Sequence, residues 1–190
     1  EGQQYDMDFE SQAKVSVVDY IQMIERKTSA LLSGSAMIGA TIAGASDADI
    51  KLLYRFATEL GLAFQLQDDL LDSYGDEALG KKIGGDILEG KQTYLMVQAM
   101  SRATEEEREV LRTTHLSDKL SDAEKIATVK ALYDKLEVKR ATEQQIDQLN
   151  LLLANALKAE LESVGATVIL NRSDNTAINV NERQEQLLEI

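Results

Sequence analysis

The chain has 190 residues, enough for one sizeable hydrophobic core, and we predict a single domain. Its 33 acidic and 20 basic residues give a formal net charge of −13. This charge argues against sequence-independent binding to nucleic acid phosphates and favours cations as ligands. The lack of cysteine excludes disulfides and thiolate metal sites, and the single histidine, His115, excludes imidazole-rich ones, so any metal would be bound by oxygen.

Proline is absent from the sequence, which suits long uninterrupted helices better than a loop-rich β protein. We therefore predict an all-α fold. The most apolar stretch, Ala30 to Ala45, is shorter than the roughly 20 residues of a membrane span and carries hydroxyl groups and glycines, so we predict a buried helix there and no membrane span. No secretory signal pattern begins the chain, and we expect a reducing compartment, the cytoplasm.

Helical periodicity divides the chain into predicted helices, of which the first runs from about Asp8 to Leu32. Ser46 to Asp49 offer N-cap residues to a second long helix that ends near Ser73. The glycine-rich segment from Tyr74 to Gly90 is predicted to be a loop. Further helices are predicted over 91–103, 104–112, 122–136 and 142–164, and the last 25 residues lose periodicity.

Acidic side chains share one side of the second predicted helix. At 3.6 residues per turn, Asp68, Asp69 and Asp72 fall with Gln65 within an arc of about 100°, opposite the apolar face. No basic residue lies between Phe56 and Gly80 to offset their repulsion. Mg²⁺ fits such a set, because it is commonly held by one or two carboxylates together with substrate phosphates. An ordinary solvated helix face is the alternative.

Basic residues elsewhere complement these acids. Lys27 lies on the apolar stripe of the first predicted helix, where a lysine needs either a route to solvent or an anionic partner. In the predicted loop, Lys81, Lys82 and Lys91 bracket a Gly84-Gly85 pair whose backbone N–H groups can approach an anion closely. Lysines on a flexible loop are the simpler interpretation, but acids for a metal and lysines for phosphate together predict a metal–diphosphate site.

Five segments combine these residues in fixed spacings: Gly2-Gln3-x-x-Asp6, Tyr20-x-x-Met23-x-x-x-Lys27-Thr28, Phe64-Gln65-x-Gln67-Asp68-Asp69-x-x-Asp72, Gly80-Lys81-Lys82-x-Gly84-Gly85-Asp86-Ile87 and Gly90-Lys91-x-Thr93-Tyr94. On these segments the chain resembles the C-terminal portion of a trans-isoprenyl diphosphate synthase, of the polyprenyl synthetase or farnesyl/geranylgeranyl diphosphate synthase type. The resemblance runs through residues 1–165 of a single domain, 1–190, and the tail 166–190 does not share it.

The resemblance implies a bundle of long antiparallel helices around a deep cavity, usually in a homodimer. It also implies a reaction, in which an allylic diphosphate held by Mg²⁺ loses its diphosphate and the carbocation is attacked by isopentenyl diphosphate. Loss of a proton then gives a longer trans-prenyl diphosphate. We therefore expect a prenyltransferase that uses Mg²⁺ and these two diphosphates, and its metals and lysines would stabilise the developing charge.

The resemblance also assigns roles on the second predicted helix and beside Lys27. Asp68 is expected to coordinate Mg²⁺, and Asp69 and Asp72 to hold metal or its waters. Thr28 and Gln65 are expected to steady the carbocation region, and Gln65 also to contact substrate. The expected catalytic residues are four: Lys27, Thr28, Gln65 and Asp68.

The lysines are expected to bind the leaving diphosphate. Lys27 is one such ligand by motif position, and Lys82 or Lys81 is the second, with the spacing back from Lys91 favouring Lys82. Lys91 and Asp86 are expected to support the same pocket. Each lysine would act on the phosphate oxygens as a flexible point charge.

The chain departs from the family where its first residues begin. Family members carry an earlier Asp-rich motif with an arginine pair, which residues 1–190 do not contain, so we expect this chain to hold only the second Asp-rich half of the site, without the N-terminal helices of the family. We expect apolar exposure around Tyr20 and Met23, a homodimer or complementing chain, weak binding of Mg²⁺ and diphosphate, and no turnover alone. A noncatalytic partner subunit and a terpene cyclase-like protein are the alternatives.

Overall fold

The computed structural model describes residues 1–12, 14–75, 83–163, 165–168 and 170. Within these residues every regular element is helical and no strand occurs, which confirms the predicted all-α fold. In chain order the elements are α1 (Gly2–Ser11), α2 (Val17–Ile24), the π-helical turn η1 (Glu25–Ser29), α3 (Ala30–Ile42), α4 (Asp47–Tyr74), α5 (Gly85–Glu89), α6 (Tyr94–Arg102), α7 (Glu105–Thr113), the 3-10 turn η3 (Thr114–Leu116), α8 (Asp122–Lys135) and α9 (Val138–Ser163).

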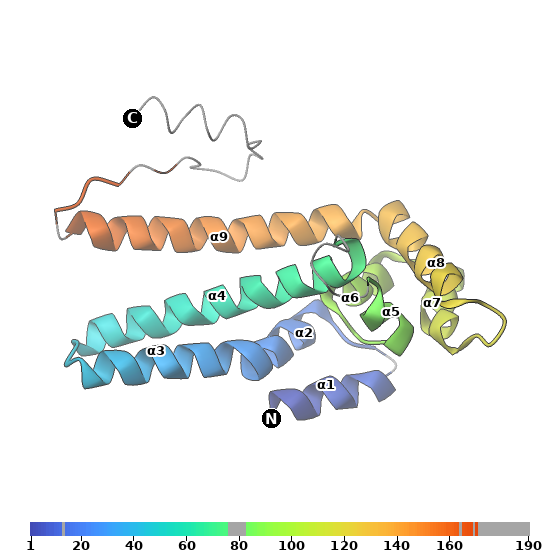
Figure 1. Cartoon of the computed structure of the whole chain (residues 1–190), viewed down its shortest axis with the longest axis horizontal. Helices are drawn as coiled ribbons and strands as arrows, with labels where there is room; N and C mark the ends of the chain where they lie inside the picture. Colours follow the sequence, from blue (N-terminus) through green and yellow to red (C-terminus); the bar gives the residue numbers. More distant parts are fainter. Residues whose placement is uncertain (13, 76–82, 164, 169, 171–190) are drawn as a thin grey trace.

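Three long helices form the body of the molecule, with α4 packed between α3 and α9 (Figure 1). The shorter helices α5 to α8 gather around the C-terminal end of α4, and α1 lies against η1 and α2 (Figure 1). None of the helices in the described part of the chain is long and apolar enough to cross a membrane. The C-terminal end of α4 is therefore the place where the most segments meet.

The prediction of a single helix from Asp8 to Leu32 is wrong, because α1 ends at Ser11 and α2 begins at Val17. A new helix begins after Ser16, whose side chain accepts a hydrogen bond from the backbone N–H of Asp19 while the Asp19 carboxylate accepts one from the Ser16 backbone. This reciprocal capping satisfies two backbone donors and favours a helix start. The helix then widens into a π turn over Glu25–Ser29 and continues to Ile42.

The second long helix is confirmed. Ser46 caps α4, because its hydroxyl accepts a hydrogen bond of 3.2 Å from the Asp49 backbone N–H. The predicted loop after α4 contains a short helix, α5, between Gly84 and Gly90, which both adopt left-handed backbone angles with φ of 78° and 70°. The helix predicted from residue 91 begins instead at Tyr94, after the N-cap Thr93.

The later helices lie close to their predicted ranges. Thr104 caps α7 and Ser121 caps α8, each with a glutamate three residues later. Helix α9 begins at Val138 rather than at Thr142, because the only interruption after α8 is a tight turn at Leu136 and Glu137. Of the last 25 residues, 169 and 171–190 lie outside the described part of the chain.

The core lies between α2, α4, α6, α8 and α9, where Leu66, Leu95 and Tyr133 are at most 1% exposed. Burying a side chain of this size stabilises the fold by about 2 kcal/mol. The expected apolar exposure around Tyr20 and Met23 is wrong, because both are 2% exposed within this core. The prediction of a buried helix over Ala30 to Ala45 is also wrong, because only Ser33 and Ala40 of α3 are buried. Exposed apolar side chains lie along α3 and α4, at Leu31, Leu32, Met37, Ile38, Ile42, Leu52, Leu53, Tyr54, Leu60 and Phe64.

Candidate functional site

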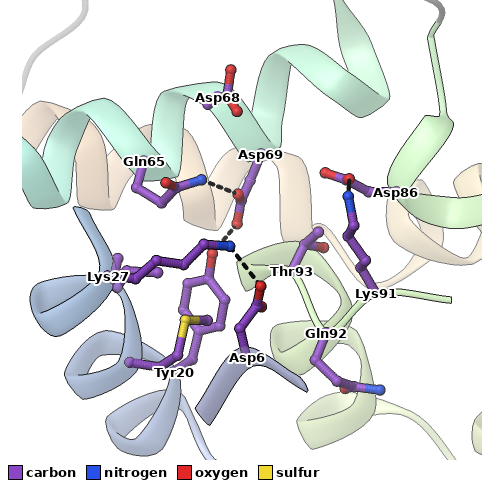
Figure 2. Close-up of a pocket in the computed structure, with 12 residues that line it drawn as sticks. Asp6, Tyr20, Lys27, Gln65, Asp68, Asp69, Asp86, Lys91, Gln92 and Thr93 are labelled. Carbon is purple, nitrogen blue, oxygen red and sulfur yellow. Dashed lines mark hydrogen bonds and ion pairs between the residues drawn. The ribbon is translucent and has the colours of Figure 1, made fainter. Parts of the chain in front are cut away.

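A pocket of about 190 Å³ lies beside the C-terminal half of α4. Side chains from α1, α2, η1, α4, α5 and the segment that leads into α6 line it (Figure 2). Polar and charged groups outnumber the apolar ones. The lining residues are Asp6, Tyr20, Met23, Ile24, Lys27, Gln65, Asp68, Asp69, Asp86, Lys91, Gln92 and Thr93.

The pocket brings most of the predicted site together. Lys27, Gln65, Asp68, Asp69 and Lys91, which are spread over 65 residues of sequence, all contribute to its wall, as does Asp86. Thr28 and Asp72 lie next to it without lining it, and they act through the side chain of Gln65 and the backbone of Asp86 respectively. Lys81 and Lys82 lie outside the described residues.

Lys27 extends from η1 toward the pocket and forms an ion pair with Asp6 of α1. The Nζ atom lies 2.6 Å from Asp6 Oδ2, and the two side chains are 34% and 23% exposed. Figure 2 shows the lysine crossing the pocket toward this carboxylate. Asp6 had no predicted role, although it closes the first of the five motif segments. The ion pair fixes the position of the ammonium group at the pocket.

Lys91 is held from the opposite side. Its Nζ atom lies 2.8 Å from Asp86 Oδ1 and 2.9 Å from Glu89 Oε2, both on α5. The hydrogen bond to Asp86, which has the largest effect, and the hydrogen bond to Glu89 raise the pKa of Lys91 above its usual value. The lysine is therefore a permanent positive charge opposite Lys27.

Asp69 is the most buried acid of the site. It is 4% exposed, and its carboxylate accepts hydrogen bonds from the Tyr20 hydroxyl, from the Tyr94 backbone N–H at 2.8 Å and from Gln65 Nε2 at 3.1 Å. Burial raises the pKa of Asp69 to about 6, although these three hydrogen bonds act in the opposite direction. The carboxylate thus joins α2, α4 and the start of α6.

Gln65 connects Asp69 to η1. Thr28 Oγ1 donates to Gln65 Oε1 at 2.8 Å, while Gln65 Nε2 donates to Asp69 Oδ1. Because each end of the amide has a partner of the right kind, the orientation of the Gln65 side chain is fixed. The sequence placed Gln65 and Asp69 on one helical arc, but it gave no sign that Thr28 and Tyr20 approach them.

Asp72 holds the start of α5, the helix that carries Asp86. Its carboxylate accepts the Asp86 backbone N–H at 3.1 Å, and its carbonyl oxygen accepts the Gly84 N–H at 2.6 Å. Burial and the charge of Asp86 raise the pKa of Asp72. Since the Gly84 N–H is used in this bond to α4, it is not directed at an anion in the pocket, contrary to the sequence-based expectation.

The donor set of the pocket fits a cation that prefers oxygen and keeps part of its hydration shell. Among the described residues, no three acidic or histidine side chains converge closely enough to hold a metal by themselves. Asp68 and Asp86 line the pocket, and the Asp68 carboxylate points away from Lys27 in Figure 2, at the edge of the site. Mg²⁺ is commonly held by one or two carboxylates, substrate phosphates and water, and this set is compatible with that pattern.

Comparison with known proteins gives a family match over most of the chain. The model of the polyprenyl synthetase family matches residues 1–136. A geranylgeranyl diphosphate synthase of Sulfolobus acidocaldarius is 46% identical over 112 residues, which are 58% of this chain and 34% of that protein. A geranylfarnesyl diphosphate synthase of Natronomonas pharaonis is 34% identical over 181 residues, which are 91% of this chain and 51% of that protein.

Solved structures give the same result. A crystal structure of a geranylgeranyl pyrophosphate synthase superposes on this chain with a TM-score of 0.75 at 31% sequence identity. The match covers 97% of this chain and 53% of the chain in that crystal structure. The geranylgeranyl pyrophosphate synthetase of Pyrococcus horikoshii superposes with a TM-score of 0.74 at 29% identity, over 83% of this chain and 47% of its own. The chain thus spans about half the length of these structures and between a third and a half of the curated relatives above.

Proposed function

Because the chain belongs to the polyprenyl synthetase family, we propose that it carries part of the active site of a trans-prenyltransferase. The enzyme would condense isopentenyl diphosphate with an allylic diphosphate to give a longer trans-prenyl diphosphate. The observation that supports this best is the meeting of Lys27 and Lys91 with Asp68 and Asp86 at one pocket, since the four residues come from η1, α4, α5 and the segment before α6.

The two lysines are proposed to bind the diphosphate of the allylic substrate. Each ammonium group has three N–H donors, so phosphate oxygens can be bound while a carboxylate partner still orients the side chain. In the described structure Asp6 orients Lys27, and Asp86 orients Lys91. Lys82, or in its place Lys81, remains the proposed additional ligand of the same group.

Asp68 and Asp86 are proposed to hold Mg²⁺ together with the substrate diphosphate. When bound, the metal supplies positive charge that stabilises the departing diphosphate. The proposal keeps Asp69 and Asp72 as holders of metal-bound water, in addition to the protein contacts that they already make. Those contacts fix the start of α6 at Tyr94 and the start of α5 at Asp86, and they thereby support the placement of the other ligands.

Thr28 and Gln65 are proposed to face the reacting allylic carbon. Their hydrogen bond of 2.8 Å fixes the amide, and an oriented carbonyl dipole can stabilise a nearby positive charge. Tyr20, Met23 and Ile24 surround this part of the pocket and are each at most 2% exposed. An apolar surrounding suits a carbocation, because a water molecule would capture it.

The complete reaction is proposed for a whole enzyme of which this chain supplies one part. The first Asp-rich motif and the isopentenyl diphosphate site are proposed to lie in a part of that enzyme other than these 190 residues, and the enzyme is proposed to act in the cytoplasm, as a homodimer or with a complementing chain. The long apolar surface on α3 and α4 supports the need for such a partner. Alone, the chain is expected to bind Mg²⁺ and diphosphate weakly and not to turn over.

Product analysis separates this function from the two alternatives. The chain, alone and with a candidate complementing chain, would be incubated with labelled isopentenyl and dimethylallyl diphosphates and Mg²⁺. Prenyl diphosphates longer than the starting material, formed only in the combined sample, are expected. A cyclic hydrocarbon would instead indicate a terpene cyclase-like protein, and unchanged substrates in every combination would indicate a noncatalytic subunit.

A matched pair of variants tests the metal ligand. Asp68→Asn is expected to weaken the binding of magnesium pyrophosphate by about tenfold or more, because one charge-assisted ligand is lost. Asp47→Asn, at the exposed N-terminal end of the same helix, is the control and should change the affinity by less than about twofold. Equal affinities for Asp68→Asn and the unmodified chain would rule out the proposed metal site.

A further inference from the structure

Two residues of the proposed active site, Lys27 and Thr28, lie on a π-helical turn rather than on regular α-helix. Lys27 and Thr28 are at the centre of η1, whose closing bond runs from the Ala30 N–H to the Glu25 carbonyl. Such a turn is uncommon and is found most often at functional sites. Its wider backbone must be held in place by what packs against it.

On one side, Gly2 of α1 touches the backbone of this turn. A Cβ atom built on Gly2 would lie 2.3 Å from the Lys27 nitrogen and 2.5 Å from the Lys27 Cα atom. These are backbone atoms, so no side-chain rotation relieves the overlap. Any larger residue at this position would push α1 away from Lys27.

On the other side, Gly61 of α4 touches the same turn. Its Cβ atom would lie 2.5 Å from Ser29 Oγ and 2.7 Å from Ser29 Cα. Ser29 is fully buried, and its hydroxyl has no hydrogen-bond partner among the described residues. The close approach of α4 and η1 at Ser29 is therefore a packing contact. Within the described part of the chain, the Ser29 hydroxyl forms no hydrogen bond that would hold the two elements together.

Each glycine is followed, one helical turn later, by the residue that holds a side chain of the π turn. Asp6 follows Gly2 by four residues and binds Lys27 Nζ, and Gln65 follows Gly61 by four residues and binds Thr28 Oγ1. Residues four apart share one face of a helix. Each flanking helix thus contacts the turn twice, first at the backbone and then at a functional side chain.

We propose that Gly2 and Gly61 are positioning residues that clamp the π turn and thereby place Lys27 and Thr28 at the pocket. The proposal rests on the proposed function of Lys27 as a diphosphate ligand. Two glycines of α3 provide the contrast, because a Cβ atom on Gly34 or Gly39 meets nothing within 4 Å.

The first experiment measures pyrophosphate affinity in the presence of Mg²⁺ for the full chain. Gly61→Ala and Gly2→Ala are expected to weaken binding by about tenfold, whereas the matched controls Gly34→Ala and Gly39→Ala change it by less than about twofold. Equal affinities in all four variants would overturn the clamp.

A double-mutant cycle separates positioning from a general loss of structure. With Lys27→Ala already present, adding Gly2→Ala is expected to change the affinity by less than about twofold, because the lysine it places has been removed. An undiminished further loss would mean that Gly2 does not act through Lys27, and the proposal would be wrong.

Amide hydrogen exchange tests the clamp even if the chain binds no pyrophosphate. In Gly2→Ala, the amides of 27–30 are expected to exchange about tenfold faster than in Gly39→Ala, because α1 no longer packs closely against the π turn. Unchanged exchange at these amides overturns the clamp. Absence of pyrophosphate binding by the unmodified chain, with faster exchange in Gly2→Ala, would refute the proposed function of the pocket and leave the clamp standing.

Discussion

The burial of Asp69 predicts a specific pH dependence of stability. The pKa of this carboxyl group is raised to about 6 from the model-peptide value of 3.8, chiefly by burial. A raised carboxyl pKa means that the folded state disfavours the charged form. The stability contributed by the neutral form is therefore fully present below about pH 4 and is lost as the pH rises through about 6.

The size of the effect follows from the two pKa values. A difference of about two units corresponds to about 3 kcal/mol over the whole titration, and roughly half of this falls between pH 5 and pH 7.5. Because Asp69 is 4% exposed, solvent screening does not reduce this figure much. The loss is large against a typical domain stability of about 5 to 15 kcal/mol.

Comparison with Asp69→Asn isolates this one group. Asparagine can still accept from the Tyr20 hydroxyl and the Tyr94 N–H but loses the acceptor for Gln65, a cost of about 1 kcal/mol that is independent of pH. Urea unfolding at several pH values would give the free energy of unfolding of both proteins. The variant should gain about 1 kcal/mol relative to the unmodified chain between pH 5 and pH 7.5. A difference that stays constant over this range would refute the assignment of a raised pKa to Asp69.

Three further substitutions test other parts of the structure. Ser29→Ala removes a buried hydroxyl without a partner among the described residues, so thermal unfolding should show unchanged stability or a gain of up to about 1 kcal/mol; a clear loss would reveal a partner of that hydroxyl. Ser16→Ala removes the cap of α2 and should cost about 1 kcal/mol in urea unfolding, whereas an unchanged midpoint would mean that the capping box contributes little. Gly39→Ala, on an open face of α3, should stabilise the chain by about 1 kcal/mol through helix propensity, and destabilisation would contradict the open surroundings of that glycine.

Local signals in the sequence were sufficient for the longest helix, α4. The cap at Ser46 and the unbroken period that follows it predicted α4 nearly to the residue. The break before α2 was missed, although Ser16 and Asp19 have the spacing of a capping box, because the periodicity on either side of it looked continuous. The π turn at 25–29 has no local signal of this kind. It depends on the close approach of Gly2 and Gly61, which are distant in sequence.

The candidate site was predictable in its residue types more than in its contacts. The arc of acids on α4 and the lysines pointed to a common pocket, and the structure places Asp68, Asp69, Lys27 and Lys91 there. Helical geometry could not show that Asp69 is buried, because its donor Tyr20 lies 49 residues earlier in the chain. The apolar face that the periodicity predicts for this helix is not wholly buried: Phe64 is 63% exposed, since burial depends on which neighbours are present.

Magnesium-dependent binding of pyrophosphate tests the central claim most directly. Calorimetric titration of the full chain with pyrophosphate would be run with Mg²⁺ and again with excess chelator, for the unmodified protein and for Lys27→Ala. The account predicts binding that needs Mg²⁺ and that weakens by about tenfold or more without the lysine. Binding that is equally strong with chelator, or equally strong without Lys27, would contradict a shared magnesium–diphosphate site in this pocket.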